Sequence, residues 1–318
     1  MNREIGGYIE LDESSGEEYH SKAIRLNTGR NCLRYIIRSR NVKKIALPIY
    51  DCDAVEKTAR EEKIEISYYH VDRQLNPIIS SLSDDEYLYY VNYYGLKSDQ
   101  IRLIYSQHEK MIVDNAQAFF DRPVCGCDTL YTCRKFFGVC DGAYLYIDKK
   151  LDDPIPESKS YDRIGYILGR YENRADEFYS DYVKNEKAVA ELPISNMSKL
   201  TKNMLKSIDY EMIKNVRTSN YDHIRTLLDK YNELEIKSVA GAYMYPLLIK
   251  NGCELRRKLI ERKIYIPLLW PNVIETCSRD DIEYHVADNL VPIPCDQRYS
   301  LSDMEYIADN IADILQKE

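Results

Sequence analysis

Short apolar runs alternate with amphipathic segments through the first half of the chain. The runs have the length and composition of buried strands, and the segments between them have the apolar spacing of helices. The predicted strands are residues 44–50, 64–71, 87–94, 111–113 and 142–147. The predicted helices are residues 32–39 and 53–62, with a helical or mixed segment at 98–109, and residues 1–27 are predicted to be irregular. This alternation predicts a mostly parallel sheet with helices on its faces.

The pattern changes after about residue 152, where helical spacing dominates. One long helix is predicted at residues 162–190 and another at 196–232, and the sequence Leu-Pro-Ile-Ser separates them. Strands at 242–249 and 264–270 and helices at 254–262 and 302–316 complete the chain. We therefore predict an α/β protein with a large domain over residues 1–200. Residues 201–318 then form a connecting helix and a smaller α+β C-terminal domain.

Composition narrows the class of protein. A hydrophobic fraction of 44% in 318 residues supports a large buried core. The net charge of −8 and the lack of a long basic run argue against nucleic acid as the main partner. The polar, acidic N-terminus has no signal-peptide core, and no apolar run approaches the ~20 residues of a membrane span. With nine cysteines interpreted as reduced thiols, we expect a cytoplasmic protein without membrane association.

Four of these cysteines cluster within residues 125–140, which raises the alternative of a zinc site. The cluster lacks the paired Cys-x-x-Cys spacing of common structural zinc sites. We therefore expect no metal and treat these residues as ordinary thiols.

The candidate chemistry lies between residues 111 and 146. Asp114 ends a predicted buried strand, where open α/β sheets place ligands, and a buried carboxylate needs a cationic partner. Lys135 sits beside Arg134 and two phenylalanines, and an amine placed among apolar groups or near positive charge can act as a nucleophile. Taken singly, Asp114 is better explained as a turn residue, and Lys135 as a surface lysine.

A third signal precedes the first predicted helix. The sequence Thr28-Gly29-Arg30-Asn31 combines a helix cap with a glycine that lets backbone N–H groups approach an anion. A phosphate would fit at this helix start. A plain helix N-terminus is the alternative.

Taken in order, these segments resemble the fold type I pyridoxal-phosphate enzymes, which have the aspartate aminotransferase-like fold. Within them the chain is most similar to the sugar aminotransferases of the DegT/DnrJ/EryC1/StrS group. The segments that carry the resemblance are Thr28 to Asn31, Asp114 to Gln117 and Thr132 to Lys135, with the Tyr243 to Trp270 pattern and the late Pro292-Ile293-Pro294.

The resemblance implies a role for each of these positions. Lys135 would bind pyridoxal 5'-phosphate covalently and then move protons as the catalytic residue. Asp114 would pair with the pyridine nitrogen, and Gln117 would lie near the phenolic oxygen. The phosphate would be held by Thr28, Gly29, Arg30 and Thr132, and by Asn196 reaching across from a partner subunit. The implied activity is transfer of an amino group from an amino acid such as glutamate to a keto sugar nucleotide, in a homodimer.

The sequence also departs from the family pattern. Many members have a Ser-x-His-x-x-Lys style loop, whereas here the lysine loop reads Tyr131-Thr132-Cys133-Arg134-Lys135. Cys52 stands about where an aromatic residue would stack on the cofactor ring, with Tyr50 as a possible substitute. These departures leave open a pyridoxal-phosphate fold with a lyase-like reaction, or with a regulatory or binding role and no transamination.

Overall fold

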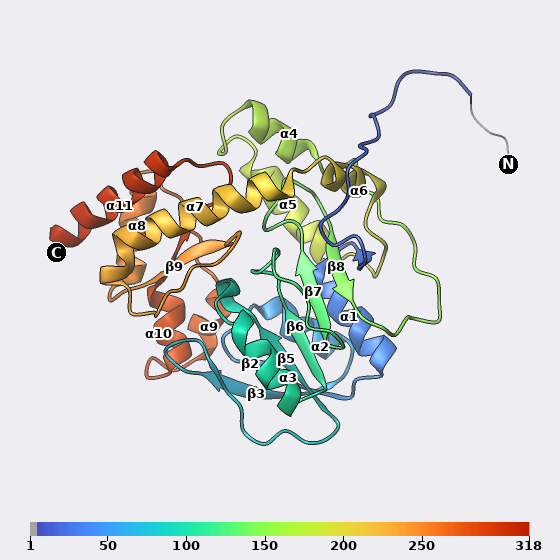
Figure 1. The fold of residues 1–318 in the computed structure, drawn as a ribbon, viewed down its shortest axis with the longest axis horizontal. Coiled ribbons are helices and arrows are strands. Elements are labelled where there is room, and N and C mark those ends of the chain that lie inside the picture. The colour runs from blue at the N-terminus through green and yellow to red at the C-terminus, as the bar shows by residue number, and fades with distance from the viewer. Residues whose placement is uncertain (1–4, 318) are drawn as a thin grey trace.

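A computed structural model describes residues 5–317, and its largest feature is one eight-stranded sheet (Figure 1). The strand order is β1-β8-β7-β6-β5-β2-β3-β4. These strands are β1 (Ile24–Leu26), β2 (Lys44–Pro48), β3 (Glu65–Val71), β4 (Pro77–Ile78), β5 (Glu86–Val91), β6 (Met111–Asp114), β7 (Asp128–Thr132) and β8 (Ala143–Tyr146).

The centre of the sheet is parallel and its ends are antiparallel. Strands β3, β2, β5, β6 and β7 pair in parallel, whereas β8 runs antiparallel to both β7 and β1. The central strands are apolar almost throughout because helices cover both faces of a parallel sheet. Since parallel strands end at the same edge, Asp114 at the end of β6 lies on the edge where such sheets bind ligands.

Three helices connect the strands of the first half: α1 (Gly29–Arg40), α2 (Asp53–Glu61) and α3 (Ile101–Gln107). Helix α1 begins three residues before and ends one residue after the predicted helix at 32–39. The Thr28 hydroxyl accepts a hydrogen bond from the Asn31 N–H, and Asn41 ends the helix in a left-handed conformation with φ of 55°. The apolar side of α1 packs into the core through Cys32, Leu33 and Ile36.

The second half of the chain builds a smaller layer beside the sheet (Figure 1). Its strands β9 (Met244–Leu248) and β10 (Leu290–Pro294) pair antiparallel. Its helices are α4 (Gly165–Glu172), α5 (Tyr179–Ala190), α6 (Lys199–Lys206), α7 (Tyr210–Leu228), α8 (Gly252–Glu261), α9 (Pro271–Thr276), α10 (Ile282–Asn289) and α11 (Leu301–Gln316). Helix α7 packs against α11 and β9.

Three predictions for this half are wrong in detail. The predicted helix at 162–190 is two helices, α4 and α5, because the chain turns at residues 173–178. The predicted helix at 196–232 is also two, since Asp209 caps a new helix by accepting the Met212 N–H. Residues 264–270 form no strand. Instead, the backbone turns through Trp270, with φ of 56°, into Pro271 at the start of α9.

Several short elements escaped the sequence reasoning. Strand β1 lies inside the segment predicted to be irregular, the first four residues of which fall outside the described residues. Strands β7 and β10 and helices α9 and α10 were also not predicted. Three to eight residues carry too little periodicity to reveal such elements, and their stability comes from pairing with distant segments.

The predicted fold class is confirmed: a mostly parallel sheet with helices is joined to a smaller unit with its own antiparallel sheet. The proposed division at residue 200 stays a prediction, and one large buried cluster includes residues from both parts, such as Leu26, Tyr221 and Ile311. Within residues 5–317, none of the helices has the length and apolar character to cross a membrane.

Candidate functional site

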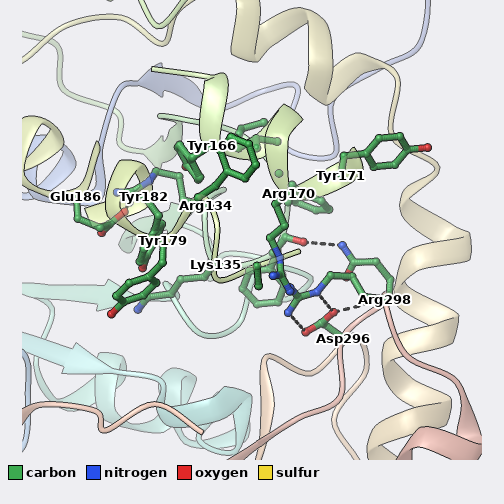
Figure 2. Close-up of a pocket in the computed structure, with 18 of the residues that line it drawn as sticks. Arg134, Lys135, Tyr166, Arg170, Tyr171, Tyr179, Tyr182, Glu186, Asp296 and Arg298 are labelled. Atoms are coloured by element: carbon green, nitrogen blue, oxygen red, sulfur yellow. Dashed lines mark hydrogen bonds and ion pairs between the residues drawn. The ribbon is translucent and has the colours of Figure 1, made fainter. Parts of the chain in front are cut away.

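A cavity of about 1210 Å³ lies beside the β7–β8 connection and brings several of the predicted residues together. Thr28 and Gly29 from the start of α1 line it, together with Thr132 and Lys135 from the segment after β7. Figure 2 draws Lys135 between the tyrosines of α5 and the Asp296–Arg298 pair. Two segments that are far apart in sequence therefore share one cavity.

The start of α1 has the form of an anion cradle. Thr28 caps the helix through its oxygen, at 3.1 Å from the Asn31 nitrogen, and its hydroxyl hydrogen remains available to donate. A Cβ on Gly29 would lie 2.8 Å from the Thr132 methyl carbon, closer than side-chain carbons approach each other. Only glycine therefore lets the α1 backbone and Thr132 meet, at an end where the helix dipole favours an anion.

Arg30 follows this cradle but is not among the described residues that line the cavity. It lies near Arg134: burial lowers the pKa of Arg134, and the positive charge of Arg30 acts in the same direction. Arg134 forms an ion pair with Glu186 of α5. Helix α5 is thereby tied to the residue that precedes Lys135.

Asp114 is buried behind the cavity wall. One of its carboxylate oxygens accepts a hydrogen bond from the Tyr89 hydroxyl at 2.7 Å, and the other accepts from the Ala116 N–H at 2.7 Å. These two bonds fix the carboxylate at the sheet edge. Asp114 is not itself among the described cavity-lining residues.

Asp51, which the sequence reasoning did not single out, lies within range of the charges of both Asp114 and Lys135. Burial raises the pKa of Asp51 well above its usual range, and the Asp114 charge adds to this rise, whereas the Cys52 N–H and Lys135 oppose it. One Asp51 oxygen accepts from the Cys52 N–H at 2.7 Å, and the other has no hydrogen-bond partner among the described residues. Its signal in the sequence is an acid just after a strand, at the same edge of the sheet as Asp114.

Gln117 and Asn196 lie away from the cavity lining. The Gln117 side-chain oxygen accepts from the Tyr94 N–H at 2.9 Å, which holds the loop after β5. The Asn196 side chain donates to the Ile155 carbonyl at 3.2 Å. Asn196 forms a β-bridge with Leu26, two residues before Thr28, but neither Asn196 nor Gln117 is among the described residues that line the cavity.

The candidate ring-stacking residues also have definite places. The ring of Tyr50 is buried against Trp270, with centroids 4.5 Å apart in an edge-on contact, and against Tyr93 at 5.5 Å. Tyr50 therefore belongs to the core. Cys52 is half-buried beside Asp51, and burial raises the pKa of its thiol to about 12.

The opposite wall of the cavity comes from α4, α5 and the small domain, and sequence reasoning did not place α4 or α5 there. Tyr166, Arg170, Tyr179 and Tyr182 line it from the two helices. Figure 2 shows Arg170 close to the Asp296–Arg298 pair, whose bidentate contacts are 2.7 and 2.8 Å long. The cavity thus has an aromatic side near Lys135 and a basic side near Arg298.

The four clustered cysteines do not form a metal centre in this structure. Over residues 5–317 there is no group of three or more His, Cys, Asp or Glu side chains arranged to hold a metal ion. Cys127, Cys133 and Cys140 are buried in the core, and Cys125 is exposed.

No family model matches the chain, and no curated protein matches it in sequence. Solved structures do match in shape. A DegT/DnrJ/EryC1/StrS aminotransferase from Brucella abortus is 13% identical with a TM-score of 0.63, and the match covers 92% of this chain and 85% of that one. A sugar aminotransferase from Micromonospora echinospora is 15% identical with a TM-score of 0.62, covering 92% and 87% of the two chains.

A third match is NtdA from Bacillus subtilis, solved with the bound cofactor PMP. It is 12% identical with a TM-score of 0.65, and the match covers 92% of this chain and 73% of that one. At such low identity the likeness establishes the architecture. Over more than nine tenths of its length, this chain has the fold of the DegT/DnrJ/EryC1/StrS aminotransferases.

Proposed function

We propose that this protein is a pyridoxal-phosphate-dependent aminotransferase. The observation that carries the proposal is one cavity that holds both Lys135 and the glycine cradle at the start of α1. A nucleophilic amine and a phosphate site are the two attachments that this cofactor needs. The shared fold with structures of aminotransferases, one of which holds PMP, supports the same assignment.

The residues present fit the cofactor. Thr28, Gly29 and Thr132 offer a small, donor-rich cradle for the phosphate, with Arg30 next in sequence on α1. One oxygen of buried Asp51 has no hydrogen-bond partner within residues 5–317, and the charges of Asp114 and Lys135 both act on this carboxyl group. In the proposed arrangement Asp114 pairs with the ring nitrogen, Gln117 lies beside the phenolic oxygen, and Lys135 forms the covalent attachment.

When bound, the cofactor supplies an electron sink that stabilises negative charge on the substrate carbon. The protein supplies positioning and proton transfer. Lys135 Nζ would take the proton from that substrate carbon as a general base and would hold it for the return transfer as a general acid. Asp114, held by Tyr89 and Ala116, keeps a negative charge in place for a protonated ring nitrogen. Tyr179 and Tyr182 of α5 line the cavity beside Lys135, whose side chain is exposed in the cofactor-free chain.

The proposed substrates are an amino acid such as glutamate as donor and a keto sugar nucleotide as acceptor. The basic side of the cavity supports an anionic substrate, because Arg170, Lys263 and Arg298 all line it. Arginine suits carboxylate and phosphate groups through its planar set of donors. We also propose a homodimer in which Asn196 reaches the phosphate of the partner subunit.

Absorbance spectra of the purified protein test this proposal. Wild type supplied with pyridoxal phosphate is expected to show the visible band of a lysine-bound cofactor, and glutamate is expected to convert it to the amine form. Lys135→Ala is expected to lack the band, whereas Lys149→Ala, which removes an exposed lysine, is expected to retain it. A wild type without the band, or an unchanged band in Lys135→Ala, would contradict the proposal.

A second candidate keeps the cofactor but changes the reaction. Cys52 in place of an aromatic residue, and Tyr50 packed into the core, leave no aromatic cover from this strand end. This arrangement favours a lyase-like reaction, or a binding or regulatory role. A bound cofactor that no amino acid converts to its amine form would support this second candidate over the first.

A further inference from the structure

Arg217 is a buried guanidinium in the middle of α7. It is only 2% exposed, and none of the described residues forms an ion pair with it. Burial lowers the pKa of Arg217, and the nearby Asp296 charge partly offsets this effect. Burying a cation without a carboxylate partner costs free energy of folding. Other contacts of Arg217 must therefore compensate for this cost.

The bonds of Arg217 converge on the residue that follows Lys135. Its Nη2 donates to the Phe136 carbonyl at 3.1 Å, and its guanidinium carbon lies 4.7 Å from the centre of the Phe136 ring. Its Nε donates to the Gln297 side-chain oxygen at 2.7 Å. The Gln297 amide nitrogen in turn donates to the same Phe136 carbonyl at 2.8 Å. Two donors from distant segments therefore hold one carbonyl.

The same guanidinium also binds the backbone of Ala242 and Tyr243, and the Tyr243 ring lies near the Lys135 amine. Its Nη1 donates to the Ala242 carbonyl at 2.9 Å and lies 3.4 Å from the Tyr243 carbonyl oxygen. The Tyr243 ring centre lies 5.7 Å from Lys135 Nζ. Arg217 thus fixes both the backbone that carries Lys135 and the ring that the amine faces.

A direct substrate role for Arg217 is disfavoured by its own geometry. Four of its five N–H groups already point at Gln297, Ala242, Tyr243 and Phe136. One remaining N–H cannot make the two-pronged contact with a carboxylate for which arginine is suited. The guanidinium is therefore occupied in joining α7, the start of β9 and the Asp296–Arg298 segment to the Lys135 loop.

We propose that Arg217 is a positioning residue that, with Gln297, sets the place of the Lys135 amine relative to Tyr243 and the cavity. The catalytic effect of this positioning rests on the proposed function, because it requires Lys135 to be the reacting amine. The position of the amine itself does not depend on that function. Gln297 also connects the Lys135 loop to Arg298, since Gln297 lies between Asp296 and Arg298 at the basic side of the cavity.

The test compares four variants of the full-length protein. Arg217→Gln removes the charge and most of the bonds, and Arg217→Lys keeps the charge but not the planar set of donors. Gln297→Ala removes the second donor to Phe136 and leaves Arg217 in place. Arg225→Gln is the matched control on the same helix, because Arg225 pairs only at the surface with Asp222 and Asp229, at 3.5 and 3.8 Å.

The first readout needs no cofactor. Each cofactor-free protein is treated with an amine-acetylating reagent over a range of pH, and the rate at Lys135 is measured by peptide mass spectrometry. Arg217→Gln and Arg217→Lys are expected to change the rate at Lys135 by about tenfold, because a misplaced amine changes reactivity strongly. The rates at the other exposed lysines, and at Lys135 in Arg225→Gln, are expected to stay at wild-type values.

The second readout uses the cofactor-loaded protein. The Arg217 variants are expected to lower kcat by about tenfold or more and to shift the pH midpoint of the lysine-bound visible band. Gln297→Ala is expected to lower kcat and shift the pH midpoint of the band in the same directions by smaller amounts. This variant tests the proposal if Arg217→Gln does not fold. A variant with a lower melting temperature but wild-type Lys135 labelling, band and kcat would overturn the proposal and leave Arg217 a purely structural residue.

The two readouts separate this inference from the proposed function. If wild type shows no visible band but the Lys135 labelling rate still depends on Arg217, the proposed function fails and the positioning role stands. If the band is present and no variant alters Lys135 in either readout, the positioning role fails alone.

Discussion

At the residue scale, the site depends on a few positions where one atom decides what fits. Gly29 and Thr132 meet so closely that a single methyl group on the glycine would collide. Asp51 is buried with one oxygen unpaired, so its protonation state is set by its surroundings. Both residues act through local sterics or charge, and each yields a prediction for a single substitution.

Substituting Gly29 by alanine is expected to weaken pyridoxal phosphate binding by about tenfold, or about 1.4 kcal/mol. The added Cβ would lie 2.8 Å from the Thr132 methyl carbon and would push the two sides of the cradle apart. Equilibrium dialysis against the cofactor measures the loss. The double variant Gly29→Ala with Thr132→Ser removes that methyl group and keeps the hydroxyl, so binding is expected to recover. Equal affinities in the single variant and wild type would refute the cradle.

Substituting Asp51 by asparagine is expected to stabilise the cofactor-free protein at neutral pH by about 1–2 kcal/mol. Because the folded-state pKa is raised, folding favours the protonated acid. The penalty for ionised Asp51 is absent below the unfolded pKa of about 4, grows as the pH rises from there, and is complete above the folded pKa. Denaturant unfolding at acid and neutral pH measures the free energies of unfolding.

The exposed acid Asp280 provides the control for this experiment. Asp280→Asn is expected to leave the free energy of unfolding near wild type at both pH values. The interpretation of Asp51 is wrong if Asp51→Asn destabilises the protein equally at acid and neutral pH.

At the element scale, α4 and α5 form a wall over the lysine loop that the sequence pattern merged into one helix. The turn at residues 173–178 folds α5 back so that Tyr179 and Tyr182 line the cavity. One charged contact, between Glu186 of α5 and half-buried Arg134, joins this wall to the residue before Lys135. The position of α5 is therefore coupled to the lysine loop by an ion pair as well as by apolar packing.

Breaking this ion pair is expected to loosen α5. Glu186→Gln would leave half-buried Arg134 without its counter-charge, at a cost of about 1 kcal/mol because both side chains are partly exposed. Hydrogen exchange followed by mass spectrometry is expected to show faster exchange in α5. Asp181→Asn breaks only a surface pair with Lys184 on the same helix and serves as control. Equal exchange in the two variants would show that the ion pair does not hold α5.

At the scale of the whole molecule, the single chain leaves one predicted contact unmade. Asn196 lies against residues 155–158, bonded to the Ile155 carbonyl, and does not line the cavity of its own chain. The proposed homodimer would supply this residue from the partner. A cyclic pair of identical chains would then hold two shared sites.

Mixing two inactive variants tests this arrangement. Lys135→Ala and Asn196→Ala homodimers are each expected to lose most activity, but a mixed dimer has one site with both residues intact. After unfolding and refolding together, the mixture is expected to regain about a quarter of wild-type activity. Light scattering after size exclusion checks the mass. A stable, active monomer, or no recovery in refolded mixtures that contain the mixed dimer, would contradict the shared site.

The sequence by itself determined the alternation of strands and helices and the order of the chemical segments. The spacing of apolar residues and helix capping both act locally. Thr28 and Asn41 therefore set the ends of α1, and the apolar residues before Asp114 set strand β6. The order of the cradle, the acid and the lysine was also readable, because the resemblance rests on short contiguous segments.

The tertiary structure alone decided which of these groups meet. Helices α4 and α5 became two because packing over the cavity favours the turn between them, and residues 264–270 are not a strand because the chain turns at Trp270 into α9. Arg217 is an example: its place on the apolar side of α7 marks it as unusual, but its partners lie 25 to 81 residues away. Long-range contacts depend on the whole fold, so no local pattern could show that a buried arginine holds the loop of Lys135.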